Sequence, residues 1–251
     1  MNYFQLIFSP TGGTERAANA LTETWPNVQT IDLSAQNFTS PAAPFDSDTL
    51  ALIAMPAFEA MAPQPALDRL ARLQGNGARC ALAAVYGNRA VDNTLAQMED
   101  YARKAGFLPI AAISAVAEHS LFHEFATGRP DTADCQQLSA FGSKILAKFA
   151  SGDVTCPPIP GNHDCREKRA GLIPTVSAAC TACGLCAREC PVGAISYDDF
   201  TFTDPAKCIT CMRCVSHCPA HARSVDAAVI ARVTEFLRDR CSDHKENKLS
   251  L

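Results

Sequence analysis

The chain has 251 residues, 47% of them hydrophobic, which is enough for one sizeable core and a smaller appendage. With 22 Lys and Arg residues against 26 Asp and Glu residues, the formal charge is -4, and this balance argues against nucleic acid as a partner. Residues 1–8 lack a basic leader, and no stretch approaches roughly 18 uninterrupted apolar residues, so we expect a cytoplasmic protein without a membrane span.

Five short apolar runs in the first 150 residues are predicted to be strands. They cover residues 2–8, 29–33, 50–55, 79–86 and 110–116. Apolar residues recur with helical spacing at about 14–24, 64–73, 91–105 and 132–150. This alternation predicts parallel strands joined by crossover helices, and strands that are apolar almost throughout indicate a sheet covered on both faces.

The loop after the first strand has the composition of a phosphate-binding turn. It contains three hydroxyl residues and two glycines in six positions, namely Ser9, Thr11, Gly12, Gly13 and Thr14 around a proline. Hydroxyl groups and free backbone N–H groups at a positively polarised helix start suit a phosphate, although an ordinary strand-to-helix turn is the alternative. No lysine stands where a P-loop would need one. Here the chain resembles the flavodoxin family, whose phosphate loop reads Ser/Thr-x-Thr-Gly-x-Thr and binds FMN without a cationic side chain.

Two further strand ends are expected to face the flavin ring. Sheets of this type bind their ligand at the carboxyl ends of the strands. The third strand ends in Met55, Pro56, Ala57 and Phe58, and the fourth in Tyr86, Gly87, Asn88 and Arg89. The aromatic residues could equally be packing residues, and Arg89 could be a solvated surface charge. His119, after the fifth strand, lies at the same edge, and its role stays open.

The remaining chain divides by composition. Residues 1–150 form the predicted flavodoxin-like domain, residues 151–174 a Pro- and Gly-rich linker, residues 175–225 the cysteine-rich domain, and residues 226–251 a terminal helix and tail. The terminal helix is expected to place five apolar residues on one side, namely Val225, Val229, Val233, Phe236 and Leu237. Residues 245–251 are expected to be a frayed tail.

Eight of the 13 cysteines form two copies of one pattern. The first copy is Cys180, Cys183, Cys186 and Cys190-Pro191; the second is Cys208, Cys211, Cys214 and Cys218-Pro219. A close run of three cysteines followed by a more distant Cys-Pro is typical of 4Fe-4S ligation. The alternatives are zinc sites, which use paired CxxC units, and disulfides, which suit small secreted chains.

This pattern resembles the bacterial two-cluster ferredoxins, in which the fourth cysteine of each run binds the other cluster. The resemblance implies two cofactor sites with crossed ligands. The first 4Fe-4S cluster would take Cys180, Cys183, Cys186 and Cys218, and the second Cys208, Cys211, Cys214 and Cys190. Ile195 after the first Cys-Pro corresponds to Arg223 after the second, and a positive charge there would raise the cluster potential if the side chain points inward.

Five cysteines lie outside the repeat. They are Cys80, Cys135, Cys156, Cys165 and Cys241, and we interpret them as small buried hydrophobes or incidental thiols. Cys156 and Cys165 with His163 could in principle bind a metal, but their spacing matches no known site.

The whole chain resembles the fused flavodoxin-ferredoxin proteins found mainly in anaerobes. The implied fold is an α/β flavodoxin-like, doubly wound, five-stranded parallel sheet plus a small α+β two-cluster ferredoxin domain. The implied function is electron transfer between FMN and two 4Fe-4S clusters, with redox partner proteins as electron donor and metalloenzyme acceptor. This interpretation favours an electron carrier over a stand-alone oxidoreductase. The alternatives are a flavin-dependent reductase of a small molecule such as a quinone, fed through the clusters, and a redox sensor or scaffold.

Overall fold

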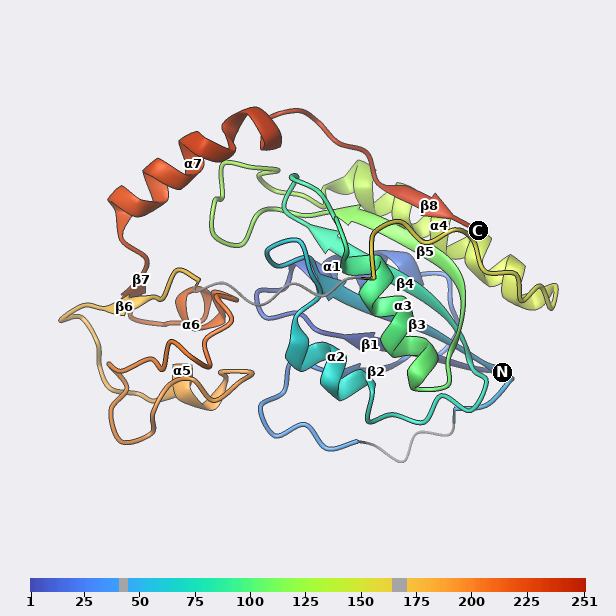
Figure 1. Cartoon of the computed structure of the whole chain (residues 1–251), viewed down its shortest axis with the longest axis horizontal. Helices are drawn as coiled ribbons and strands as arrows, with labels where there is room; N and C mark the ends of the chain where they lie inside the picture. The colour runs from blue at the N-terminus through green and yellow to red at the C-terminus, as the bar shows by residue number, and fades with distance from the viewer. Residues whose placement is uncertain (41–44, 164–170) are drawn as a thin grey trace.

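The computed structural model describes residues 1–40, 45–163 and 171–251 (Figure 1). The helices and strands, in chain order, are β1 (Asn2–Ile7), α1 (Gly13–Thr22), β2 (Gln29–Asp32), β3 (Thr49–Pro56), α2 (Gln64–Leu70), β4 (Arg79–Tyr86), α3 (Thr94–Lys104), β5 (Leu108–Val116), α4 (Thr132–Ala150), β6 (Thr175–Val176), α5 (Leu185–Arg188), α6 (Arg213–Ser216), β7 (Arg223–Ser224), α7 (Ala227–Cys241) and β8 (Lys248–Ser250).

Five parallel strands form the centre of the molecule, in the order β2-β1-β3-β4-β5. This is the strand order of flavodoxin, with the change of direction between β1 and β3. The five predicted strands and four predicted crossover helices are confirmed, with bounds within a few residues. The flavodoxin-like doubly wound sheet is therefore the fold of this half of the chain.

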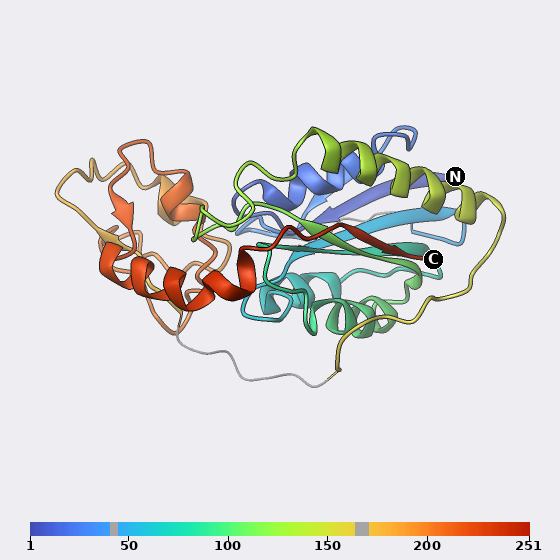
Figure 2. The same cartoon turned by 90° about the horizontal axis from the view of Figure 1, so that it is seen from above.

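Helices cover both faces of the sheet, with α1 and α4 on one side and α2 and α3 on the other (Figure 2). The alternation of side chains along β1 shows why both faces need cover. Phe4 and Leu6 are buried in the cluster that also contains residues of α2 and α3, whereas Tyr3 and Ile7 are buried with residues of α1 and α4. A strand that is apolar on both faces is stable only between two helical layers.

The α1/α4 layer is held by a close backbone approach. At Gly142 in α4, a Cβ atom would lie 1.7 Å from the carbonyl oxygen of Leu21 in α1. The Gly142 carbonyl accepts a hydrogen bond of 3.0 Å from the indole Nε1 of Trp25, just beyond α1. Glycine is therefore required at this crossing because any side chain would push the two helices apart.

The cysteine module repeats its backbone conformation as it repeats its sequence. Ala182 and Thr210, at matching positions of the two copies, both have positive φ angles, of 54° and 56°. Gly184 and Met212, which also match, are the left-handed N-caps of α5 and α6. The chain is thus wrapped twice in the same way, and the short antiparallel pair β6–β7 joins the start and the end of the module.

The terminal helix α7 packs through part of the apolar side expected for it, since Val233 and Leu237 belong both to the predicted set and to the observed contact. Ile230, Val233 and Leu237 pack against a buried cluster formed by Phe122, Phe125 and Cys241. Phe236 is 67% exposed, so its predicted place on the buried side is wrong. Because successive residues of a helix are about 100° apart, Ile230, Val233 and Leu237 lie within about 60° of one another around the axis, and Phe236 lies to one side of them.

The predicted frayed tail is also wrong. Residues Lys248–Ser250 form β8, which pairs antiparallel with β5 and becomes the sixth strand of the sheet (Figure 1). The chain therefore leaves the sheet after β5 and α4, forms the cysteine module and α7, and returns to the same sheet.

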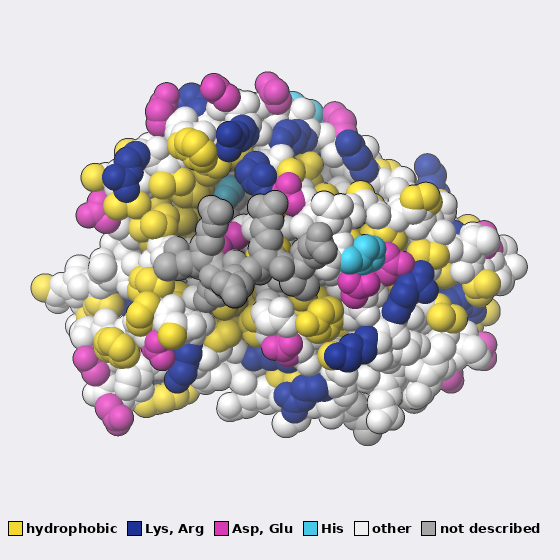
Figure 3. Space-filling view, in the orientation of Figure 1, with side chains coloured by type: hydrophobic (Ala, Val, Ile, Leu, Met, Phe, Trp, Pro, Cys, Tyr) yellow, Lys and Arg dark blue, Asp and Glu magenta, His cyan; other side chains and the backbone are white. Residues whose placement is uncertain are grey.

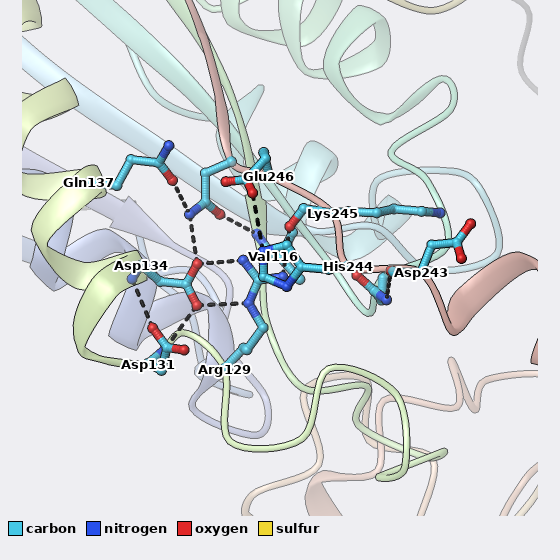
Figure 4. Close-up of polar contacts among 11 residues, drawn as sticks. Val116, Arg129, Asp131, Asp134, Gln137, Asp243, His244, Lys245 and Glu246 are labelled. Carbon is cyan, nitrogen blue, oxygen red and sulfur yellow. Dashed lines mark hydrogen bonds and ion pairs between the residues drawn. The ribbon is translucent and has the colours of Figure 1, made fainter.

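A buried polar network fixes this returning segment (Figure 4). The Asn247 side chain accepts a hydrogen bond of 2.8 Å from the Val116 N–H and donates to Asp134 at 2.9 Å. Arg129 forms a buried ion pair with Asp134 and donates to the Lys245 carbonyl at 2.7 Å. Although burial raises it, hydrogen bonds from Arg129, the Asp131 N–H and Asn247 bring the pKa of Asp134 down to about 2.

Candidate functional site

The loop between β1 and α1 has the open backbone that a phosphate requires. Gly12, with φ +89°, is the N-cap of α1, and a Cβ added there would meet nothing within 4 Å. The Ser9 hydroxyl accepts a hydrogen bond of 3.0 Å from the Glu15 N–H, and the Ser34 hydroxyl accepts one of 2.6 Å from the Ser9 N–H. These bonds hold the loop while the first turn of α1 directs backbone N–H groups outward.

Two adjoining cavities lie at the carboxyl ends of the strands. The smaller one is lined by Thr11, Gly13 and Thr14 of this loop, together with residues from the ends of β3, β4 and β5. The larger one has a volume of about 340 Å³. The two cavities share six lining residues, namely Ala57, Phe58, Tyr86, Gly87, His119 and Ser120. A ligand with an anionic end and a bulky ring system would fit this sequence of cavities, with its anion at the start of α1.

The structure brings most of the predicted flavin residues to these cavities, but not all of them. Thr11, Gly13, Thr14, Pro56, Ala57, Phe58, Tyr86, Gly87 and Arg89 line one or both. Met55 is fully buried in the core under α2 and α3. The Asn88 side chain points elsewhere, because it donates to the carbonyl oxygens of Cys241 at 2.6 Å and Asp243 at 2.8 Å. Arg89 is ion-paired with Asp92 at the rim.

The turn after β3 is under backbone strain at the cavity wall. Phe58 and Met61 exchange backbone hydrogen bonds of 2.8 and 3.0 Å across a tight turn. The two central residues, Glu59 and Ala60, have φ angles of +52° and +76°. Such angles are uncommon for residues other than glycine, and residues held this way concentrate at ligand sites.

His119 is a neutral hydrogen-bond donor in the wall common to both cavities. Its Nδ1 atom accepts hydrogen bonds from the N–H groups of Leu121 at 3.2 Å and Phe122 at 3.3 Å. This leaves the proton on Nε2. Burial, with smaller effects from His123 and Arg89, lowers the pKa of His119 to about 4. Gly87 allows the close packing, because a Cβ there would lie 2.6 Å from the imidazole ring.

The far wall of the larger cavity comes from residues that local sequence patterns did not indicate. They belong to the segment after the linker, to the second cysteine loop and to α7, namely Gly171, Leu172, Ile209, Thr210, Val233 and Leu237. On the face seen in Figure 3, hydrophobic side chains gather at the left, where α7 and the cysteine module lie. The sequence signals were the apolar Ile209 between two cysteines and the expected apolar side of the terminal helix, which includes Val233 and Leu237. Assigning these residues to the cavity wall requires the folded structure.

One polar atom in this wall has no hydrogen-bond partner among the described residues. The Thr210 hydroxyl is buried and has no hydrogen bond to any described residue. Buried polar groups are nearly always hydrogen-bonded.

Four cysteines converge around a separate small cavity in the cysteine module. Cys190, Cys208, Cys211 and Cys214 line it together with apolar residues such as Val192 and Ile195. Burial raises the pKa of the Cys211 thiol to about 12. Four thiols from two loops around one apolar hollow fit an iron-sulfur cluster, which binds a cysteine at each iron.

The other four cysteines include the one repeat cysteine that is exposed. Cys183 is exposed, and Cys180 and Cys186 are partly exposed. The Cys218 sulfur accepts a hydrogen bond of 3.3 Å from the Ala222 N–H, and at the matching position of the first copy the Cys190 sulfur accepts one of 3.2 Å from the Ala194 N–H. Backbone N–H donors to sulfur are among the features that set cluster potentials.

Arg223 points into the cysteine module. Its side chain is only 4% exposed, and it donates to the Thr203 hydroxyl at 3.0 Å and to the Phe200 carbonyl. Both acceptors are uncharged, whereas buried cations usually have a charged partner. Burial raises the pKa of the Cys214 thiol to about 11, and the charge of Arg223 opposes this rise. Burial also acts to raise the pKa of Cys218, but backbone N–H groups, with a smaller effect of the Arg223 charge, lower it. Anionic clusters held by these two thiolates, one at each site, would supply Arg223 with a counter-charge.

Little supports a metal site in the linker. His163 pairs with Asp100 at 2.9 Å, and the Cys156 thiol lies 3.8 Å from Glu99. Cys165 lies outside the described residues. Among the five cysteines outside the repeat, Cys80 and Cys241 are buried as expected, whereas Cys156 is exposed.

Comparison with protein families identifies the cysteine module. Residues 179–223 match the 4Fe-4S dicluster domain. This segment is therefore a domain that holds two 4Fe-4S clusters. In the described residues, no helix is long and apolar enough to span a bilayer.

Comparison with solved structures returns flavodoxins and flavodoxin-like proteins for the first part of the chain. A flavodoxin from the domain Archaea is 15% identical, with a TM-score of 0.43, and the match covers 60% of this chain and 99% of that one. A WrbA-like flavodoxin from Agrobacterium tumefaciens is 15% identical, with a TM-score of 0.42 and coverage of 60% and 98%. No curated protein matches the sequence. At these scores the strand order, rather than the likeness, carries the assignment of the fold.

Proposed function

We propose that this chain, in which a flavodoxin-like fold is joined to a 4Fe-4S dicluster domain, relays electrons between FMN and two 4Fe-4S clusters and on to or from partner redox proteins. Bound FMN accepts two electrons and can release them singly, whereas each cluster carries one. A protein that holds both can join single electrons into pairs or split pairs into single electrons.

The residues that would bind FMN follow from the two cavities. Thr11, Gly12, Gly13 and Thr14 would hold the phosphate at the start of α1, where N–H groups and the helix dipole favour an anion. Tyr86, Phe58 and the backbone from residue 57 to 60 would contact the ring system in the larger cavity. The Nε2–H group of His119 would donate a hydrogen bond where the two cavities meet.

The eight repeat cysteines would hold the clusters with crossed ligands. Cys190, Cys208, Cys211 and Cys214 surround one cavity, which supports their assignment to the second cluster. By the same crossing, Cys180, Cys183, Cys186 and Cys218 would bind the first cluster.

The observation that carries this proposal is that residues of the cysteine module and of α7 form one wall of the larger cavity. Its volume of about 340 Å³ is near the lower end of ligand pockets, which range over ~300–1,000 Å³. The far wall of this cavity is formed by the cysteine module and α7. A flavin ring here would have a redox module as its neighbour instead of a second substrate, which favours electron transfer over reduction of a small molecule.

The test is anaerobic reconstitution with FMN, iron and sulfide, followed by separate reduction assays with reduced ferredoxin, NADH and quinones. We expect bound FMN, two clusters and electron exchange with ferredoxin. Turnover of a quinone without any protein acceptor would favour the reductase alternative, and absence of bound FMN would overturn the proposal for the first half of the chain.

A double substitution tests the phosphate site. Thr11→Val with Thr14→Val removes two hydroxyl groups while keeping the side-chain volume, so FMN affinity should fall and the cluster absorbance should persist. Thr132→Val, at the first residue of α4, is a matched control that should leave FMN affinity unchanged.

A further inference from the structure

The second cluster site and the flavin cavity share a wall made by two residues. Ile209 and Thr210 line the cavity surrounded by Cys190, Cys208, Cys211 and Cys214, and they also line the larger cavity at the strand ends. Both residues stand between Cys208 and Cys211, so the loop that would wrap the second cluster is itself the partition.

This loop is fixed to the flavodoxin-like half. Ile209 packs against the same buried cluster as residues of α2 and α3. Gly171 also packs closely against this loop, because a Cβ at Gly171 would lie 1.8 Å from the Thr210 hydroxyl oxygen. The second site therefore adjoins the flavin cavity as part of the packed structure.

A buried arginine holds the remaining ligand of that site. Arg69 in α2 is buried and donates to the carbonyl oxygens of Leu33, after β2, and Pro191, next to Cys190. Burial is the main cause of its lowered pKa. A desolvated cation bonded to two backbone carbonyls from different parts of the chain keeps the Cys190-Pro191 turn against the sheet.

The first cluster site lies on the accessible side of the module. Residues 181–183 of its loop are all exposed, including Cys183. At the matching positions of the second copy, Ile209, Thr210 and Cys211 are partly buried, and Ile209 packs against the flavodoxin-like half. Of the two matching loops, the first therefore faces solvent and the second faces the flavin cavity.

From this asymmetry we infer the order of the relay: the second cluster exchanges electrons with the flavin, and the first cluster exchanges them with the partner protein. The inference rests on the proposed function. For inward flow, the loop of Cys180, Cys183 and Cys186 would hold the cluster that takes one electron from a protein donor such as reduced ferredoxin, and the loop of Cys208, Cys211 and Cys214 would hold the cluster that delivers it to the flavin. Two such passages, with two protons from water, complete a two-electron reduction of the flavin.

The order is tested in reconstituted full-length holoprotein with one ligand changed at a time. Cys183→Ala should slow electron uptake from reduced ferredoxin by more than an order of magnitude, while dithionite still reduces the second cluster and the flavin at near the unaltered rate. Cys211→Ala should leave uptake by the first cluster intact and slow flavin reduction by more than an order of magnitude. The opposite assignment of these two effects, or equal effects, would overturn the order.

A second pair of variants keeps all eight repeat cysteines. These variants test the order of the relay even if replacing a cysteine disrupts the whole module. Thr181 and Ile209 occupy matched positions, each directly after the first cysteine of its copy. Thr181→Trp should slow uptake from ferredoxin but not from dithionite, with FMN affinity unchanged. Ile209→Trp should weaken FMN binding, measured by recovery of flavin fluorescence, with both clusters retained. Tight FMN binding in the Ile209 variant would overturn the shared wall, whereas absence of FMN from the unaltered protein would overturn the proposed function itself.

Discussion

The imidazole of His119 is held neutral by two backbone N–H groups that point at its Nδ1 atom. A proton on Nδ1 would face the two N–H protons that already point at this atom. The ring can therefore be protonated only if these two hydrogen bonds break. Its pKa falls from 6.5 to about 4 on folding, mainly through burial. The unfolded chain therefore binds more protons between these values, and stability is lost as the pH falls through this range.

We expect the titration of His119 to lower the free energy of unfolding by about 2 kcal/mol when the pH is lowered from 7.5 to 5. The measurement is urea unfolding followed by the fluorescence of Trp25, the only tryptophan. His119→Asn keeps an acceptor near the Nδ1 position and cannot titrate, so it should remove this part of the pH dependence. His123→Asn, at an exposed position, is the control; an equal effect there would rule out His119 as the cause.

Arg223 is expected to raise the potential of the clusters beside it. A cation stabilises the more negative, reduced form of a cluster, and burial strengthens the effect. Arg223→Ile copies the residue at Ile195 in the first repeat and should lower the midpoint potentials by an amount on the order of tens of millivolts.

An EPR-monitored redox titration measures these potentials. Lys207→Met is a matched control, because Lys207 adjoins Cys208 in sequence but its side chain is 60% exposed and screened by water. A shift in the Lys207 variant as large as that in the Arg223 variant would show that burial does not amplify the charge.

At the scale of the elements, Gly142 permits the close approach of α1 and α4. Gly142→Ala would drive a methyl group into the Leu21 carbonyl, and such overpacking typically costs about 1–3 kcal/mol or more. Because Trp25 donates to the Gly142 carbonyl, its fluorescence should change together with the lowered urea midpoint. Lys144→Ala, on the exposed side of α4, should leave both unchanged. An unaltered urea midpoint in the Gly142 variant would mean that α1 and α4 can move apart without a loss of stability.

The elements that the sequence predicted well are those with an internal pattern. The β4 run from Arg79 to Tyr86 and the α4 pattern from Thr132 to Ala150 gave their bounds because apolar spacing continues over the whole element. Strand β8 had no such pattern, since Lys248, Leu249 and Ser250 form a strand only by pairing with β5. Likewise, the phosphate loop could be predicted from local residues such as Thr11 and Gly12. The cavity wall at Thr210 could not, because it forms only where the two domains pack against each other.

At the scale of the whole molecule, the cysteine module is anchored on both sides. The linker leads into it, and α7 and β8 lead out of it back to the sheet. Deletion of residues 247–251 removes β8 and the Asn247 bridge to Val116 and Asp134. We expect this deletion to lower stability by roughly 2 kcal/mol or more, since it leaves buried partners unpaired.

The deletion should also weaken FMN binding, because α7 supplies Val233 and Leu237 to the cavity wall. Fluorescence titration with FMN measures this effect, and removal of Leu251 alone, which follows β8, is the control. Unchanged FMN affinity after the larger deletion would show that α7 stays in place without its anchor.

The return of the chain to β5 also has a consequence for synthesis. Until the segment after α7 has left the ribosome, the outer edge of β5 has no partner, and an unpaired edge strand invites association with other chains. The last strand closes that edge only after all eight repeat cysteines have been made. The sheet is thus completed only in a chain that already carries both cluster sites, and a chain that stops early keeps an exposed edge that marks it for aggregation or removal.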